Sequence, residues 1–134
     1  MNVRLDDIDA CFQRAIPSVL ASTSRAGVPN VTHISIVHRI GDTHVGLSRQ
    51  FFNKTIRNLL ENPRAQALVT EPNSGRIFQL NLLYERTETE GPLFERMSAR
   101  LDAIAWAEGM AAVFKLAAVD VCRVLSCQKV ASDW

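Results

Sequence analysis

The sequence lacks any long hydrophobic run and carries almost no net charge, and each absence excludes a class of partners. No apolar stretch approaches the roughly 20 residues that a helix needs to cross a bilayer. Fifteen lysines and arginines against 14 aspartates and glutamates leave a formal net charge of +1, which supplies no broad field for nucleic acid. The acidic, amphipathic residues 1–10 are also unlike a signal peptide. We therefore expect a cytoplasmic protein with neither nucleic acid nor a membrane as its partner.

Cysteine is scarce, and its spacing matches neither a disulfide framework nor a metal site. The chain has three cysteines, an odd number without a C-x-x-C pair, namely Cys11, Cys122 and Cys127. This usage is typical of reduced thiols. No three histidines, cysteines or carboxylates have metal-site spacing, so we expect no bound metal. The sequence also lacks the nucleophile turn that a Ser-His-Asp catalytic triad requires. We assign no catalytic side chain from these residues.

What the chain does contain is enough apolar sequence for one core. Its 134 residues are 47% hydrophobic and 22% charged, which is ordinary for a single globular domain. We expect that domain to cover residues 1–134, with an N-terminal helix over residues 1–16 and a tail over residues 128–134. The helix is predicted because apolar residues recur every three or four positions from Leu5 to Ile16.

Alternating polar and apolar residues between turn signals predict six strands. They cover residues 18–22, 30–39, 43–48, 65–70, 77–90 and 119–125. Gly41-Asp42 is expected to form the turn of a hairpin. Helices are predicted before Pro63, from Pro92 onward and over residues 110–116. Because few connections are helical crossovers, the pattern favours an antiparallel barrel with peripheral helices over a doubly wound sheet.

The stretch Val45–Pro63 gathers hydrogen-bond donors of the kind that an anion requires. Asn53 occupies an N-cap position, and Lys54 and Thr55 follow in the first helical turn, whose unpaired N–H groups and dipole favour a phosphate. Three further donors end the preceding strand: Ser48, Arg49 and Gln50. The same residues also fit an ordinary capped surface helix, so both interpretations stay open at this level.

Three segments together resemble a known family. They are P-S-V-L-A-S-T-S-R-A-G-V-P-N-V-T at 17–32, S-R-Q-F-F-N-K-T-I-R-N-L-L-E-N-P at 48–63, and R-T-E-T-E-G-P-L-F-E-R-M at 86–97. Their order and spacing resemble those of the pyridoxamine 5'-phosphate oxidase-like, FMN-binding split-barrel proteins. The last two segments are most similar to a bacterial branch of this family in which such a domain sometimes precedes sensory or signalling modules. The resemblance covers residues 16–125. It implies a six-stranded antiparallel split β-barrel of Greek-key type, and a homodimer with two FMN sites at its interface.

The resemblance also implies a set of cofactor-binding residues. Lys54 takes a position where the family usually has a phosphate-binding arginine or lysine, and Thr55 stands where a second lysine is common. The family's contacts on the second strand map to residues 33–38, and a flavin-contacting glutamine on the long strand matches Gln79 loosely. The residues expected to bind FMN are therefore His33, Ile34, Ser48, Arg49, Gln50, Asn53, Lys54, Thr55 and Gln79.

The function implied by the resemblance is a flavin-dependent oxidoreductase of unknown substrate. The flavin would carry the hydride, while the protein supplies binding, orientation and electrostatics. The basic C-terminal segment with which the true oxidase holds pyridoxamine phosphate has no counterpart here, so we do not expect that substrate. A non-catalytic flavin-binding or redox-sensing module is the alternative. Haem binding through a histidine is a third interpretation.

Overall fold

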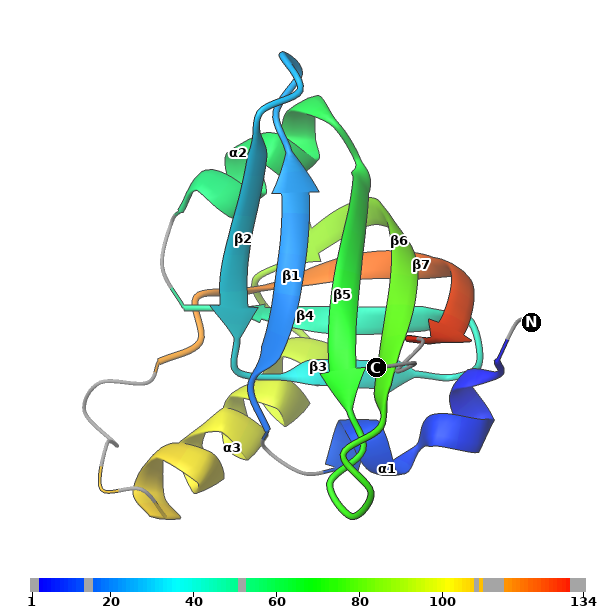
Figure 1. Ribbon diagram of the computed structural model, residues 1–134. Coiled ribbons are helices and arrows are strands. Elements are labelled where there is room, and N and C mark those ends of the chain that lie inside the picture. Colours follow the sequence, from blue (N-terminus) through cyan, green and yellow to red (C-terminus); the bar gives the residue numbers. More distant parts are fainter. Residues whose placement is uncertain (1–2, 14–15, 51–52, 108, 110–114, 131–134) are drawn as a thin grey trace.

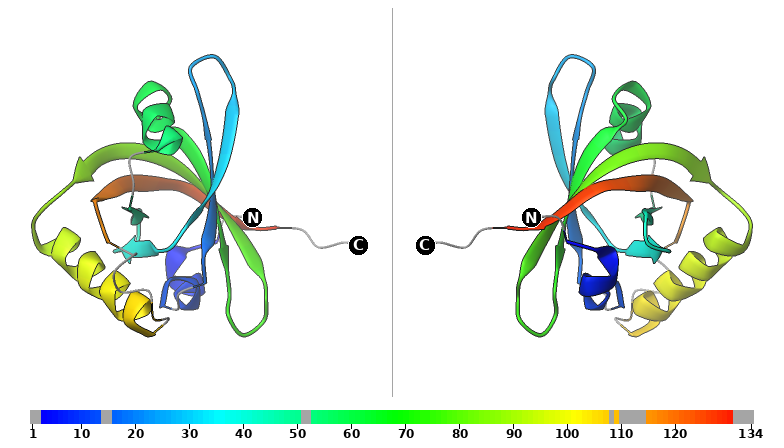
Figure 2. Two further views of the ribbon diagram at one scale, coloured as in Figure 1. Left: turned by 90° about the vertical axis from the view of Figure 1, so that its left-hand side faces the viewer. Right: turned by 90° about the vertical axis from the view of Figure 1, so that its right-hand side faces the viewer.

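The computed structural model describes residues 3–13, 16–50, 53–107, 109 and 115–130. Within them, seven strands form one antiparallel sheet in the order β2-β1-β5-β6-β7-β4-β3. The sheet curls into an open barrel with helices around it (Figure 1, Figure 2). The strands are β1 (Ser18–Thr23), β2 (Pro29–Ile34), β3 (Val37–Ile40), β4 (His44–Arg49), β5 (Arg64–Thr70), β6 (Ile77–Glu88) and β7 (Ala118–Lys129). The helices are α1 (Ala10–Gln13), α2 (Lys54–Glu61) and α3 (Pro92–Ala107), preceded by a 3₁₀ turn at Leu5–Ile8.

The fold class is confirmed, but the sheet has seven strands rather than six, because residues 30–39 do not form one strand. The chain leaves β2 after Ile34 and enters β3 at Val37, on the opposite edge of the sheet. Two hydrogen bonds hold the link: the Ile36 amide donates to Ser48 Oγ at 3.0 Å, and the Ser48 amide donates to the Ile36 carbonyl at 3.1 Å. Both halves alternate in the same way, so the pattern does not reveal the change of partner.

Both ends of the chain also differ from the prediction. The helix expected over residues 1–16 is a 3₁₀ turn followed by the short α1, because apolar spacing of three or four does not distinguish the two. The tail expected from residue 128 begins later, since Gln128 and Lys129 still pair with β6. Residues 131–134 lie outside the described residues. So do residues 110–114 of the helix expected over 110–116.

The core has two parts that share strand β7. One part fills the barrel interior, and the other lies between the sheet and α3. Val119 and Val121 belong to the part under α3, whereas Cys122 belongs to the barrel interior. Side chains alternate along a strand, so Asp120 points with Cys122 into the barrel. None of the helices in the described part of the chain is long and apolar enough to cross a lipid bilayer.

Helix α2 packs on the barrel with its N-terminus fixed by specific contacts. The predicted N-cap is confirmed, because Asn53 Oδ1 accepts from the Ile56 amide at 3.3 Å. Ile56 and Leu59 pack into the barrel core. The buried Asn58 donates from Nδ2 to Ser22 Oγ at 3.1 Å, which ties the helix to β1. These contacts set where the first turn of α2 lies relative to the sheet.

The N-terminal segment, β3 and α3 meet around His38. Arg100 of α3 donates to the Phe12 carbonyl and, over 3.2 Å, to His38 Nδ1. An arginine can only donate, so Nδ1 accepts and the neutral imidazole carries its proton on Nε2. Burial first, then the positive charges of Arg100 and Arg96, lower the pKa of His38 below its ordinary 6.5.

This arrangement should make the protein less stable in mild acid. The unfolded chain protonates His38 near pH 6.5 and the folded chain resists it, so stability present above that pH is lost as the pH falls through the lowered folded-state pKa. His38→Gln keeps an acceptor for Arg100 and should remove this part of the pH dependence, worth up to about 1.4 kcal/mol per pH unit. Urea unfolding across that pH range measures the effect, with His33→Gln on the exposed side of β2 as control. Parallel profiles for wild type and His38→Gln would contradict the assignment.

Candidate functional site

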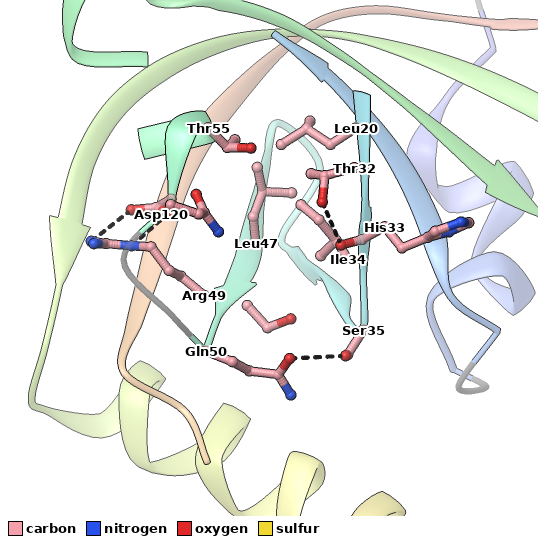
Figure 3. A pocket seen from close by; sticks show the side chains of 12 residues that line it. Leu20, Thr32, His33, Ile34, Ser35, Leu47, Arg49, Gln50, Thr55 and Asp120 are labelled. Carbon is pink, nitrogen blue, oxygen red and sulfur yellow. Dashed lines mark hydrogen bonds and ion pairs between the residues drawn. The ribbon is translucent and has the colours of Figure 1, made fainter. Parts of the chain in front are cut away.

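Seven of the nine residues expected to bind FMN lie around one cavity of about 220 Å³ (Figure 3). They come from the ends of β2 and β4 and from the start of α2, which are distant in sequence. The seven are His33, Ile34, Ser48, Arg49, Gln50, Asn53 and Thr55. Five further residues complete the lining: Leu20, Thr32, Ser35, Leu47 and Asp120.

The other two predicted residues do not line this cavity. Lys54 opens α2 between Asn53 and Thr55, and its side chain is exposed to solvent beside the lining. Gln79 lies towards the other end of β6, where its amide donates to Asn81 Oδ1 at 3.2 Å. It is eight residues, roughly 25 Å along the strand, from Thr87, the β6 residue whose hydroxyl contacts Asp120 in the lining. The structure therefore does not bring Gln79 to the cavity of its own chain.

Two hydroxyl groups in the lining are positioned by bonds that they accept. Ser48 is buried and accepts from the Ile36 amide. Thr55 is also buried, and its Oγ1 accepts from Asn30 Nδ2 at 3.2 Å. A hydroxyl that accepts still has one proton to donate, so both can serve as donors to a ligand. The imidazole of His33, by contrast, points away from the cavity (Figure 3).

Asp120 is the cavity residue that the sequence analysis missed. It is 4% exposed, and its Oδ2 lies 3.2 Å from Arg49 Nε. Arg49 Nη2 and the Thr87 hydroxyl donate to Oδ1 at 3.4 and 2.7 Å. Burial raises the pKa of Asp120 above its ordinary 3.8, against the opposing effects of Thr87 and Arg49. The available signal was a lone acidic residue between Val119 and Val121, an unusual position for an unpaired carboxylate.

A bulge in β6 builds the support behind Asp120. The register between β6 and β7 shifts between Tyr84 and Arg86. Tyr84 and Thr87, three residues apart, would face opposite sides of a regular strand, but the bulge brings them to the same side. Their oxygens lie 2.6 Å apart. Because Thr87 gives its single proton to Asp120, Tyr84 is the donor in this contact.

The cavity wall also contains a buried donor that lacks a partner. Gln50 Nε2 is buried without a hydrogen bond among the described residues, while its Oε1 accepts weakly from Ser35 Oγ at 3.5 Å. Arg49 Nε likewise has only the ion-pair contact with Asp120 and not the geometry of a hydrogen bond. A buried donor without an acceptor is costly, and a ligand oxygen would relieve it. The lining thus suits a ligand with many acceptor atoms.

Comparisons with known proteins show the fold. Neither the family models nor the curated protein sequences that we compared give a match. An FMN-binding protein from Syntrophomonas wolfei is 21% identical with a TM-score of 0.73, over 95% of this chain and 90% of that chain. A candidate pyridoxamine 5'-phosphate oxidase from Lactobacillus delbrueckii is 9% identical with a TM-score of 0.59, over 98% and 94%. This chain has the split-barrel fold of the pyridoxamine 5'-phosphate oxidase-like proteins.

The split barrel supports more than one function in known proteins. HutZ, the haem storage protein from Vibrio cholerae, is 18% identical to this chain with a TM-score of 0.56, over 97% of this chain and 93% of that chain. Fold alone therefore does not choose a ligand. In the described part of this split barrel, no three histidine, cysteine or acidic side chains gather in a way that could hold a metal ion. The choice between ligands depends on the residues of the cavity.

Proposed function

We propose that the cavity binds FMN and that the chain is a flavin-dependent oxidoreductase. The observation that carries the proposal is the convergence of β2, β4 and α2. The nine positions that the family resemblance implies as FMN contacts come from separate segments of the chain, and seven of them line one cavity. The donor-rich lining, including the unpartnered Gln50 amide, fits a cofactor with phosphate and carbonyl oxygens.

The N-terminal turn of α2 would hold the phosphate. Its free amide groups and dipole favour an anion, and the Thr55 hydroxyl and the Lys54 ammonium add a donor and a charge. Asn53 is engaged in capping, so its side chain would act by fixing the turn. Lys54 is exposed and can reach a phosphate at the cavity mouth without losing an existing ion pair among the described residues.

The rest of the lining would bind and orient the cofactor. Gln50 and Ser48 offer donors to polar ring or ribityl atoms, while Leu20 and Leu47 supply apolar contact. When bound, FMN would supply the hydride-transfer chemistry. No lining residue is assigned as the general acid or base, and we leave the substrate open.

An absorbance spectrum with and without FMN tests the cofactor. The protein should retain flavin absorbance after free FMN is removed, and Lys54→Ala should weaken binding about tenfold through loss of a charge-assisted bond. Lys129→Ala, an exposed lysine at the end of β7, is the matched control. A colourless protein that ignores FMN would refute the assignment. Flavin that binds but is not turned over with NAD(P)H would favour the redox-sensing alternative.

The histidines do not support the haem alternative. His38 is held by Arg100, and His44 contacts Glu85 at 2.8 Å through Nε2 and Thr43 at 2.7 Å through Nδ1. The imidazole of His33 lies on the outer face of β2, away from the cavity. A haem ligand from this set would have to give up an existing contact or bind outside the cavity. We therefore favour flavin.

We also propose that the protein is a homodimer formed through the outer face of the sheet. The register places two rows of side chains on this face, and neither row contains a lysine, arginine or acidic residue. The first row is Val31, Ala21, Gln66, Asn81 and Ser126; the second is His33, Val19, Leu68, Gln79 and Gln128. Val31 is 68% exposed. Two adjacent uncharged rows on an exposed sheet face support association with another surface. Gln79 would then face a second copy.

Sedimentation velocity tests the dimer. Gln66→Glu places like charges near each other in a symmetric interface that uses the middle of the first row, and should shift the protein towards monomer. Leu60→Glu on the exposed side of α2 is the control and should leave the sedimentation coefficient unchanged. A wild-type monomer at micromolar concentration would overturn this part of the proposal.

A further inference from the structure

Asp120 neutralises the charge of Arg49 in the cavity wall, so the pair has no net charge. Both residues line the cavity, from neighbouring strands β4 and β7. Their charged groups meet at 3.2 Å, so the cation and the anion cancel. The other ionisable residue in the lining is His33, whose ring points outward. Arg49 is therefore present in the wall but not available as a free cation.

We propose that Asp120 is a specificity-determining residue that weakens the preference of the cavity for phosphorylated over unphosphorylated flavin. The inference rests on the proposed flavin site and adds a property to it. A free arginine in a cavity partly shielded from water would attract the phosphate dianion and discriminate strongly against a neutral ligand. Paired with Asp120, it contributes shape and hydrogen bonds but little net field.

The surroundings of Asp120 prevent Arg49 from leaving to meet a phosphate. If Arg49 swung away, the buried carboxylate would keep only the hydrogen bond from Thr87, whose orientation is set by Tyr84. A buried carboxylate without its cation is strongly disfavoured. Another titratable group that interacts with Asp120 is Cys122, whose pKa is raised to about 12 by burial and by the charges of Asp120 and Glu85. That thiol stays neutral and offers no substitute charge.

A charge cycle in four proteins tests the proposal. Wild type has no net charge at the pair, Asp120→Asn leaves +1, Arg49→Met leaves −1 at a pH above the folded-state pKa of Asp120, and the double variant is again uncharged. Each is titrated with FMN and with riboflavin at low salt, where charge effects are least screened, by the quenching of flavin fluorescence. The measured quantity is the ratio of the riboflavin dissociation constant to the FMN dissociation constant.

We expect this ratio to rise about tenfold in Asp120→Asn, to fall several-fold in Arg49→Met, and to return to the wild-type value in the double variant. Riboflavin affinity alone should change little in Asp120→Asn. Asp42→Asn is the matched control, because it removes a carboxylate paired with an arginine outside the cavity. Circular dichroism checks that each variant is folded. If Arg49→Met does not fold, the ratios for wild type, Asp120→Asn and the double variant are sufficient to test the proposal.

The outcomes separate this inference from the proposed function. If both flavins bind and the ratio is the same in wild type, Asp120→Asn and the double variant, the role of Asp120 is wrong and the flavin site stands. If the ratio rises equally in Asp120→Asn and in the double variant, the effect does not come from the freed arginine and the inference also fails. If none of the four proteins binds either flavin, the proposed function fails, and the inference fails with it.

Discussion

Arg49→Met is expected to lower the free energy of unfolding by about 3 kcal/mol near neutral pH, because it leaves a buried carboxylate without its cation. The arginine side chain is 15% exposed and that of Asp120 is 6% exposed, so water can relieve little of this cost. The methionine fills much of the volume of the arginine stem. The loss should therefore come chiefly from the charge rather than from a cavity.

The pH dependence identifies the cause. Asp120 already has a folded-state pKa above 3.8, and loss of Arg49 raises that pKa further. The folded variant then holds a proton that the unfolded chain releases, so its stability falls as the pH rises from 3.8 through the folded-state pKa. Its deficit relative to wild type should shrink in mild acid. Urea unfolding at several pH values measures this.

The double variant Arg49→Met/Asp120→Asn is the control for charge. It removes both partners and should recover most of the lost stability, as apolar or neutral replacements of a buried pair often do. If it is as unstable as Arg49→Met at every pH, the cost comes from lost packing around the arginine stem, and the electrostatic account of this wall is wrong.

Met97→Ala is expected to destabilise the protein by about 3 kcal/mol through a cavity under α3. Met97 is fully buried, and its sulfur lies against Gly46 of β4. A Cβ at Gly46 would lie 2.9 Å from Val119 Cγ1 and 3.0 Å from Met97 Sδ, so the glycine leaves the space that the thioether occupies. Leu60→Ala, at a leucine that is 67% exposed, should cost much less in the same urea unfolding measurement.

A second substitution tests whether the two residues share that space. Gly46→Ala should overpack wild type by about 1–3 kcal/mol, but should cost less in the Met97→Ala background, where its methyl group has room. The difference is the coupling energy of the pair. Equal costs in both backgrounds would show that Val119, rather than Met97, limits the side chain at position 46.

Much of the fold could be predicted because its signals are local. The hairpin around Gly41 and the capped start of α2 are each encoded within about ten residues, and both are confirmed. The change of partner at residues 35–36 is different, because it depends on which distant strand each half meets. Alternation of polar and apolar residues indicates that a segment is a strand, but it does not indicate which strand pairs with it. One expected strand therefore became β2 and β3.

The candidate site also combines residues that are close in the sequence with residues that only the fold brings together. Ser48, Gln50, Asn53 and Thr55 belong to one continuous motif, and the structure places them on one cavity. Asp120 is 71 positions from Arg49 in the sequence, and its orientation depends on the register of β7. Thr87 reaches it only because of the bulge in β6. A one-residue shift in that register would be invisible in the residue pattern, yet it reverses every side chain beyond it.

The link between β2 and β3 has a consequence for the rate at which a ligand enters the cavity. β2 and β3 are the two edges of the sheet, and a short link through Ser35 and Ile36 joins them, with Ser35 in the cavity lining. The hydrogen bonds between Ile36 and Ser48 fix this link to β4. If a ligand enters past this link, the fraction of time that these bonds are broken limits association, and a bound ligand that contacts both β2 and β4 keeps them formed. The Ile36 amide would then report residence time through the slowing of its hydrogen exchange.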